Sequence, residues 1–198
     1  MVRRYGIFGG AFDPPHTGHL AVAQAACREM RLDTLFFVPT FSPPHRSQPR
    51  ASFHHRLGML QAMTENLAWA KVSGVELEIS TPTYAIDMVR RLKAMQNPND
   101  RAFFLLGADN YRSFKTWSRW RELLEEAELI VYPRGDSLPM PIQEIPAHFL
   151  QAPLIAEQSS AIRQGLERGA GIDGMPCLPA VIAYIKQNGL YGVGERSA

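Results

Sequence analysis

Short apolar runs alternate along the chain with longer segments in which apolar residues recur at every third or fourth position. An apolar run of about four to eight residues is typical of a buried strand, whereas the longer spacing is typical of an amphipathic helix. The pattern predicts strands over 5–8, 34–38, part of 70–79, 102–106 and 128–132. It predicts helices over 17–30, 52–65, 84–95, 110–126, 160–168 and 179–188.

Strands that alternate with helices indicate βαβ units, in which each helix crosses over to the next parallel strand. We therefore predict an α/β fold with a Rossmann-like open, mostly parallel sheet, helices on both faces and a small helical C-terminal subregion at about 159–191. The 198 residues and 45% hydrophobic content suit one domain over 1–198. Proline-rich segments at 41–49 and 136–146 are predicted to be loops.

Composition narrows the classes of partner. The formal net charge is +2 and the basic residues are scattered, so we expect no extended nucleic-acid surface. The apolar run after the basic N-terminus is too short for a signal segment or a membrane span, which favours a cytoplasmic protein with no membrane partner. Cys27 and Cys177 lack C-x-x-C spacing and are predicted to be reduced thiols. A homo-oligomer is left open.

The segment between the first strand and the first helix carries the strongest candidate chemistry. Gly9 and Gly10 allow the backbone to approach a ligand closely, and the helix that follows offers unpaired N–H groups and the positive end of its dipole. His16 and His19 lie about one helical turn apart at that helix start. The pattern indicates a phosphate site that contains two imidazoles, although both histidines could instead serve packing or capping.

Polar residues and glycines also follow other predicted strands directly. Thr40, Gly107, Asp109 and Arg134 come after the second, fourth and fifth strands. Ligands of open α/β sheets bind beyond the carboxyl ends of the strands, so we expect these positions to converge on one large site. No G-x-G-x-x-G follows the first strand and the chain has no G-K-[ST], which excludes a dinucleotide-binding dehydrogenase and a P-loop NTPase.

The eleven residues from Gly9 to His19 resemble the H-x-G-H signature region of the nucleotidyltransferase superfamily, and in particular of the nicotinate-nucleotide adenylyltransferase family. The resemblance implies transfer of the adenylyl group of ATP to nicotinate mononucleotide, which gives nicotinate adenine dinucleotide and pyrophosphate with Mg²⁺ as cofactor. It implies that His16 and His19 are catalytic and bind the triphosphate. Gly9, Gly10 and Phe12 would line the ATP site, with Phe12 also facing the second substrate.

Two further segments resemble the family's ATP-binding motifs. The run 43–46 is similar to P-P-H-K, a loop over the nucleotide phosphates, which makes His45 and Arg46 candidates for ATP binding. The run 158–163 is similar to I-S-S-T-x-I-R and implies that Arg163 is catalytic and reaches the β- and γ-phosphates. Its ATP-binding candidates are Ser159, Ser160, Ile162 and Arg163. Each segment could also be ordinary: an exposed basic loop, and a serine-capped helix with a surface arginine.

Three segments bear on the substrates. The run 81–87 resembles T-Y-T-x-D-T-L, so Thr83 and Tyr84 become candidates for contact with the pyridine nucleotide, while Thr81 or Thr83 could serve as an N-cap. The run from Gly107 resembles G-A-D…W, in which the tryptophan stacks on the nicotinate ring. The corresponding candidates are Gly107 and Asp109 for ATP, Asp109 also for Mg²⁺, and Trp117, Ser118 and Thr40 for nicotinate mononucleotide. Asp109 could equally be a helix cap, and Trp117 a core residue.

Ala11 and Ala161 stand where the family usually has threonine. Each loses a hydroxyl that could donate to phosphate, at a cost of about 1 kcal/mol. Other members of the superfamily, such as phosphopantetheine adenylyltransferases and cytidylyltransferases, remain alternatives because they share the H-x-G-H chemistry. A module that senses ATP without turnover is an alternative of a different class.

Overall fold

The structure is a computed structural model that describes residues 2–42, 48–134, 140–151 and 158–193. His45 and Arg46, two of the predicted ATP-binding residues, lie outside these ranges. The strands are β1 (Arg4–Gly10), β2 (Thr34–Pro39), β3 (Ala70–Val72), β4 (Arg101–Gly107), β5 (Glu128–Tyr132) and β6 (Ala147–Phe149). The helices are α1 (Thr17–Met30), α2 (Phe53–Thr64), α3 (Ala85–Lys93), α4 (Ala108–Arg112), α5 (Trp120–Glu126), α6 (Ser159–Glu167) and α7 (Pro179–Gln187).

The strands form one sheet in the order β3-β2-β1-β4-β5-β6, and every neighbouring pair is parallel. This arrangement confirms the predicted Rossmann-like α/β fold. The chain moves outward from β1 to β3 on one side and from β4 to β6 on the other, so the direction of the strand order reverses between β1 and β4. Such a reversal leaves a crevice at the carboxyl ends of the two central strands.

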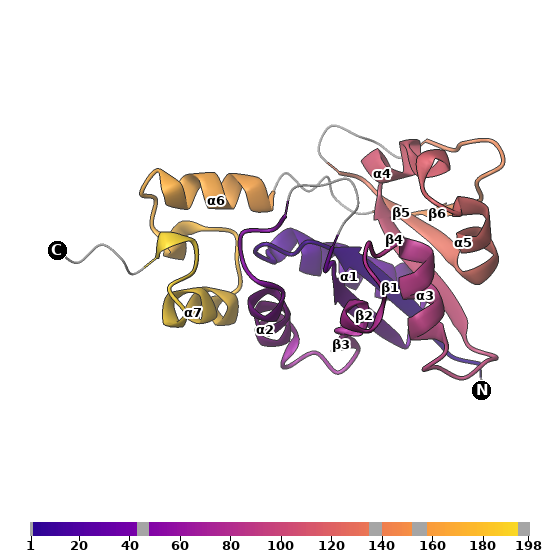
Figure 1. Ribbon diagram of the computed structural model, residues 1–198, viewed down its shortest axis with the longest axis horizontal. Helices are drawn as coiled ribbons and strands as arrows, with labels where there is room; N and C mark the ends of the chain where they lie inside the picture. Colours follow the sequence, from indigo (N-terminus) through magenta and orange to yellow (C-terminus); the bar gives the residue numbers. More distant parts are fainter. Residues whose placement is uncertain (1, 43–47, 135–139, 152–157, 194–198) are drawn as a thin grey trace.

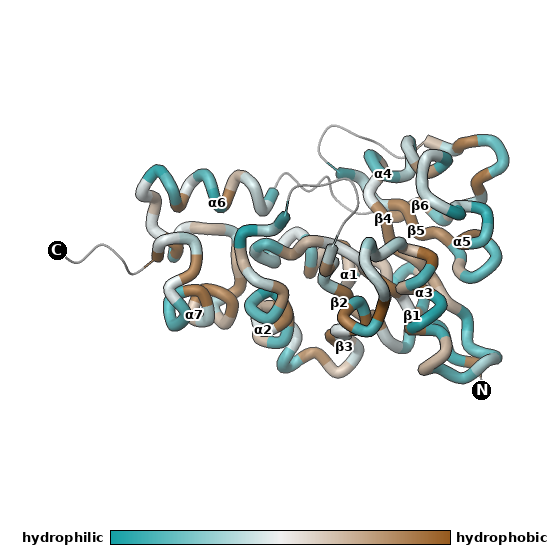
Figure 2. The backbone as a smooth tube through the Cα atoms, in the orientation of Figure 1, coloured by the Kyte–Doolittle hydropathy of each residue, from teal (hydrophilic) through white to brown (hydrophobic). Residues whose placement is uncertain are grey.

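Alternate residues of each strand face opposite sides of the sheet and enter two separate hydrophobic clusters. Along β2, Leu35 and Phe37 belong to one cluster, while Phe36 and Val38 belong to the other. Helices α1, α2, α6 and α7 pack on the first cluster, and α3, α4 and α5 on the second. The tube in Figure 2 is correspondingly hydrophobic along the central strands and hydrophilic on the outer turns of the helices.

The C-terminal helices α6 and α7 lie at the opposite end of the molecule from α5, as Figure 1 shows. Ile162 and Leu166 of α6 and Val181 and Ile185 of α7 are buried in the same cluster as α1 and α2. The predicted helical features of α7 are confirmed, because Pro179 begins the helix and Gly189 follows it with a φ of 58°. No helix of the described ranges is long and apolar enough to span a bilayer.

One prediction of secondary structure was wrong, one was confirmed for part of its range, and one strand was missed. The helix predicted over 110–126 is divided into α4, a 3-10 turn at Phe114–Thr116 and α5, with Arg119 in the left-handed region at φ 53° between the last two. The strand predicted for part of 70–79 is confirmed as β3, and Val75–Glu78 form a 3-10 helix after it. The three-residue strand β6 was not predicted.

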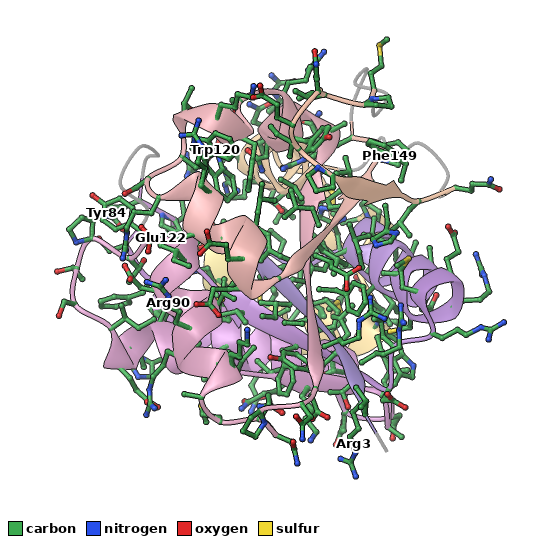
Figure 3. The ribbon with its side chains drawn as sticks, turned by 90° about the vertical axis from the view of Figure 1, so that its right-hand side faces the viewer. Arg3, Tyr84, Arg90, Trp120, Glu122 and Phe149 are labelled. Atoms are coloured by element: carbon green, nitrogen blue, oxygen red, sulfur yellow. The ribbon has the colours of Figure 1, made fainter. Side chains whose placement is uncertain are left out.

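Polar contacts tie α3 to α5 on the outer face of the second cluster. Arg90 of α3 reaches Glu122 and Glu126 of α5 at 2.9 and 3.0 Å, and Lys93 reaches Glu126 at 2.9 Å. Figure 3 shows Arg90 pointing toward Glu122. Exposed ion pairs contribute little stability singly, but this set fixes the helix that follows Tyr84 relative to the segment that carries Trp117.

Candidate active site

Two adjoining cavities open at the carboxyl ends of β1 and β4, where the strand order reverses. Their volumes are about 300 and 390 Å³. Gly9, Gly10, Ala11, Asn110 and Trp117 line both of them, so the two cavities share a wall at the end of β1. The first cavity is also lined by Phe12, His16, His19, Gly107, Arg134, Ser159, Ser160 and Arg163. The second is also lined by Thr40, Glu76, Thr83, Tyr84, Met88 and Ser118.

The loop between β1 and α1 shapes the floor of the first cavity. Phe12 adopts a φ of 49° and buries its ring against that of His19, with centroids 4.9 Å apart. A Cβ on Gly10 would lie 3.1 Å from the Phe12 ring, so this tight turn favours glycine. His16 is the N-cap residue of α1, whose positive dipole end faces the cavity that Gly18 lines, while the N–H of Thr17 donates to the carbonyl oxygen of Pro176 at 2.8 Å.

His16 and His19 stack at the start of α1 with ring centroids 3.7 Å apart. The backbone N–H of His16 donates to Nδ1 of His19 at 3.2 Å. Burial, together with the positive charge of Arg134, lowers the pKa of His16 from 6.5 to about 4. Burial, His16 and Arg134 likewise hold the pKa of His19 well below its usual value. Both rings are therefore neutral at pH 7 and offer N–H donors without charge.

Arg163 of α6 and Arg134, which follows β5, bring two guanidinium groups to the first cavity. Nη1 of Arg163 donates to the carbonyl oxygen of Asp13 at 2.6 Å. Arg134 lies 3.6 Å from the carboxylate of Asp109. The sequence indicated Arg134 only as a residue that follows a predicted strand. In the structure its positive charge acts on both His16 and His19.

Asp109 lies beside the first cavity without lining it. The N-cap of α4 is Gly107, so Asp109 is not the cap residue that its position also suggested. Its Oδ1 is buried and has no hydrogen-bond partner within the described part of the chain. A Cβ on Gly107 would lie 2.5 Å from this Oδ1 and 2.9 Å from Cδ of Arg134. Glycine at 107 is therefore required for the close approach of the Asp109 and Arg134 side chains.

The serines at the start of α6 do not cap it, because the N-cap is Gln158 and makes no side-chain cap bond. Ser159 instead donates to the carbonyl oxygen of Pro14 at 2.9 Å, which ties α6 to the loop before α1. Ser160 lies 3.3 Å from Oε1 of Gln158. Ile162 is buried in the core and does not line the cavity, and its backbone N–H donates to the carbonyl oxygen of Gln158 at 3.1 Å.

The second cavity is organised by Glu76, a buried carboxylate that sequence reasoning missed. Its Oε2 accepts from the backbone N–H of Phe41 and from Oγ1 of Thr83, both at 2.7 Å. Burial raises the pKa of Glu76, and these two donors oppose the rise. Thr83 is therefore not an N-cap, and Tyr84 precedes α3 in its place without a side-chain cap bond. Thr40 is fixed by its N–H, which donates to the carbonyl oxygen of Gly10.

Trp117 is the half-buried aromatic residue between the two cavities. Its ring packs edge-on against Phe104 at 6.1 Å and is tilted against Phe114 at 5.4 Å between centroids. Ser118, which follows it, is exposed and lines the second cavity. An indole that packs on its edge against the core and also lines a cavity can offer the rest of its surface to a flat ligand.

An H-x-G-H loop at the reversal of a parallel sheet, beside a second cavity, defines a nucleotidyltransferase. In agreement, the profile of the cytidylyltransferase-like family matches residues 7–165. The chain is 38% identical over 200 residues to a probable nicotinate-nucleotide adenylyltransferase of Bordetella petrii, with 96% of this chain and 100% of that protein covered. It is 34% identical over 202 residues to one of Neisseria meningitidis serogroup B, covering 96% and 99%. The chain belongs to the nicotinate-nucleotide adenylyltransferase family.

Solved structures agree on the fold. The nicotinic acid mononucleotide adenylyltransferase of Plasmodium falciparum complexed with NaAD superposes with a TM-score of 0.77 at 21% identity, covering 98% of this chain and all of that one. A putative nicotinate-nucleotide adenylyltransferase of Vibrio parahaemolyticus superposes with a TM-score of 0.69 at 18% identity, covering 92% and 97%. At these identities the likeness concerns the architecture, which matches the six-stranded parallel sheet described above.

Proposed function

We propose that the chain transfers the adenylyl group of ATP to nicotinate mononucleotide. The 5′-phosphate oxygen of nicotinate mononucleotide forms a bond to the α-phosphorus of ATP while the bond from that phosphorus to the bridging oxygen of pyrophosphate breaks. The products are nicotinate adenine dinucleotide and pyrophosphate. The observation that carries this proposal is the pair of cavities with a shared wall, because it can hold two nucleotides with their phosphates adjacent.

The protein's task in this reaction is to position two polyanions and to stabilise charge in the transition state. The attacking phosphate is already anionic at neutral pH, so the reaction needs no side-chain nucleophile. Neutral His16 and His19 would donate to the phosphates from the start of α1, where the positive end of the helix dipole also favours an anion. Gly9 and Gly10 end β1, Phe12 follows in the loop, and Gly107 ends β4, so all of them line the same cavity.

Arg163 would neutralise the leaving pyrophosphate. Its side chain lines the first cavity and is 25% exposed, so the guanidinium is accessible to a ligand in that cavity. Guanidinium groups bind phosphate through parallel N–H donors, which fixes orientation as well as charge. Ser159 and Ser160 would complete this side of the ATP site. Ile162, His45 and Arg46 remain predicted contributors, the last two from outside the described residues.

The second cavity suits the pyridine nucleotide. Trp117 offers a flat apolar surface for the nicotinate ring, while backbone N–H groups near Ser118 would meet its carboxylate. Thr40, Thr83 and Tyr84 line the opposite part of the cavity. Nicotinamide mononucleotide would present amide N–H groups where the protein also presents donors. Buried polar groups left unpaired discriminate strongly between otherwise similar ligands, so we expect preference for the acid.

Mg²⁺ would enter with the phosphates of ATP. Within the described ranges no three His, Cys, Asp or Glu side chains gather as a metal site. Asp109 is the candidate for holding the ion, because its buried Oδ1 still lacks a partner. Magnesium commonly combines one or two carboxylates with substrate phosphates, and it would neutralise charge on the triphosphate.

We further propose that residues 1–198 act as a single domain and that the enzyme works in the cytoplasm. The two hydrophobic clusters share one continuous sheet, which supports a single unit. Cys27 and Cys177 are both free, as a reducing compartment would keep them. Small-molecule substrates need no nucleic-acid or membrane surface. A homo-oligomer remains open and would be measured by light scattering.

The decisive experiment is pyrophosphate release from ATP and Mg²⁺ with nicotinate mononucleotide, nicotinamide mononucleotide or phosphopantetheine as acceptor. We expect strong release with the nicotinate substrate. Release with phosphopantetheine alone would keep adenylyl transfer and contradict the substrate. Tight ATP binding without release from any acceptor would instead favour a sensor.

A further inference from the structure

Four segments that are distant in sequence meet at the buried carboxylate of Asp13, which is 2% exposed. Its Oδ2 accepts from the backbone N–H of Arg50 at 2.8 Å, and its Oδ1 accepts from that of Ala51 at 3.0 Å. Tyr191, beyond α7, donates its hydroxyl to Oδ1 at 2.8 Å. Nη1 of Arg163 lies 3.5 Å from Oδ2. One carboxylate therefore joins the loop between β1 and α1 to the segment before α2, to α6 and to the C-terminal turn.

Asp13 holds Arg163 through two of its own groups. Nη1 of Arg163 donates to the Asp13 carbonyl oxygen at 2.6 Å and also lies close to the carboxylate. A guanidinium has several further N–H donors on its fork. Since Arg163 lines the first cavity, the donors that Asp13 does not use are available to a ligand there. The position of Asp13 therefore sets the position of the guanidinium.

A buried negative charge beneath a phosphate site needs compensation, because an unpaired carboxylate would repel a polyanion and would be costly to bury. Arg163 supplies a positive charge, and buried Arg56 supplies a second from the opposite side, where it donates to the carbonyl oxygens of Ala11 and Ala51. Tyr191 supplies a neutral hydroxyl. Burial and the Asp13 carboxylate raise the pKa of Tyr191, so the hydroxyl remains a donor at every working pH.

The side chain of Tyr191 thus connects the C-terminal turn Leu190–Gly192 to the loop between β1 and α1. Tyr191 itself adopts a φ of 58°, which is unfavourable for a residue with a side chain, and its hydroxyl also lies 4.0 Å from Sδ of Met59. In Figure 1 the segment that leads into α2 runs beside the C-terminal helices.

We propose that Asp13 and Tyr191 are positioning residues for Arg163: Tyr191 fixes the Asp13 carboxylate, and Asp13 holds the guanidinium where it meets the phosphates of ATP. This inference rests on the proposed role of Arg163. Asp13 lines the first cavity and Tyr191 lines neither cavity, and we assign to both a positioning role rather than a catalytic one. The C-terminal turn consequently contributes to catalysis through a chain of two contacts, and its effect should require Arg163.

The first variant is Tyr191→Phe, which removes the hydroxyl and keeps the ring. We expect about tenfold weaker pyrophosphate binding and a similar fall in kcat, with an unchanged KM for nicotinate mononucleotide, because a hydrogen bond to a charged group is lost. Tyr184→Phe is the matched control. Tyr184 also belongs to the C-terminal subregion, and its hydroxyl contacts Nδ1 of His55 at 3.3 Å and not the Asp13 carboxylate.

The second measurement separates positioning from stability. Pyrophosphate affinity is measured by calorimetry for Tyr191→Phe, Arg163→Ala and the double variant, and the free energy of unfolding is measured for each. We expect Tyr191→Phe to have no further effect on affinity once Arg163 is absent, while its effect on unfolding persists. Asp13→Asn should behave likewise if it folds, and Tyr191→Phe alone suffices if it does not.

An equal loss of affinity in both backgrounds, or no loss in either, would overturn the positioning role. If Arg163→Ala binds pyrophosphate and turns over normally, the assignment of Arg163 fails and the positioning role fails with it. These patterns differ from failure of the whole reaction, in which the unmodified chain would release no pyrophosphate with nicotinate mononucleotide.

Discussion

The Nδ1 atom of His19 accepts a hydrogen bond from the backbone N–H of His16 at 3.2 Å. An imidazole nitrogen that accepts cannot carry a proton, so neutral His19 has its proton on Nε2. The contact therefore fixes the tautomer as well as the orientation of the ring. A phosphate oxygen beside His19 would meet an N–H donor on a ring that cannot easily rotate.

Substitutions at His19 can separate the two nitrogens. Glutamine places its amide nitrogen about where Nε2 lies, whereas asparagine reaches only the position of Nδ1. We expect His19→Ala to lower kcat about 100- to 1000-fold, with a much smaller rise in KM for nicotinate mononucleotide. His19→Gln should retain more activity than His19→Asn. Steady-state kinetics would check both, and a near-normal kcat for His19→Ala would refute the catalytic assignment.

Acid should destabilise the free enzyme through His16. Its pKa is about 4 in the folded chain against an ordinary value of 6.5, so the unfolded chain binds more protons between these values. The contribution of His16 to the free energy of unfolding is therefore greatest above about pH 6.5 and falls as pH decreases toward 4. The share of His16 in the loss between pH 7 and pH 5 is about 2 kcal/mol.

Urea denaturation at pH 7 and pH 5 would measure this loss in the wild type and in His16→Asn. Asparagine is a favoured N-cap, so the variant keeps a suitable start for α1. We expect the variant to lose less stability on acidification than the wild type. Equal losses in the two proteins would mean that His16 titrates normally.

Trp117 and Trp120 form a matched pair for testing the nicotinate pocket. Both rings pack near Phe114, with centroids at 5.4 and 6.3 Å, but only Trp117 lines the cavities. We expect Trp117→Ala to raise KM for nicotinate mononucleotide roughly 10- to 100-fold, since stacking on the ring is lost. Trp120→Ala should leave KM unchanged. If both variants raise KM alike, the effect comes from packing rather than from stacking.

Ala11 and Ala161 are predicted to respond differently to replacement by threonine. Ala11 lines both cavities, whereas Ala161 is exposed and lines neither. A threonine hydroxyl at 11 could donate to phosphate, so Ala11→Thr should strengthen ATP binding about fivefold and Ala161→Thr should leave it unchanged. Calorimetric titration with ATP would test this. A gain from Ala161→Thr would show that the start of α6 reaches ATP when it is bound.

Local sequence patterns were sufficient for the central part of the fold. The bounds of α1 agree with the prediction because periodic apolar residues begin directly after His16 and stop at Met30. The break between α4 and α5 was missed because Arg119 adopts the left-handed region without a glycine or proline nearby to signal it. Strand β6 is three residues long and owes its existence to pairing with β5, which no local pattern records.

The candidate site likewise contains residues that local patterns could assign and residues that they could not. Residues in compact motifs, such as His16 and His19, could be assigned to a common loop because their spacing carries the geometry. The roles of Glu76 and Asp13 could not, because they depend on partners elsewhere in the chain. Glu76 meets Phe41 across 35 positions, and Asp13 meets Tyr191 across 178. Tertiary packing alone brings such groups together.

Both margins of the sheet consist of three-residue strands, β3 and β6. A strand at a margin exposes N–H and C=O groups on which another chain can form a further strand, and a short one offers few of them. Longer central strands are shielded by their neighbours. We therefore expect concentrated protein to resist edge-to-edge aggregation, even though its four longer strands are rich in apolar residues.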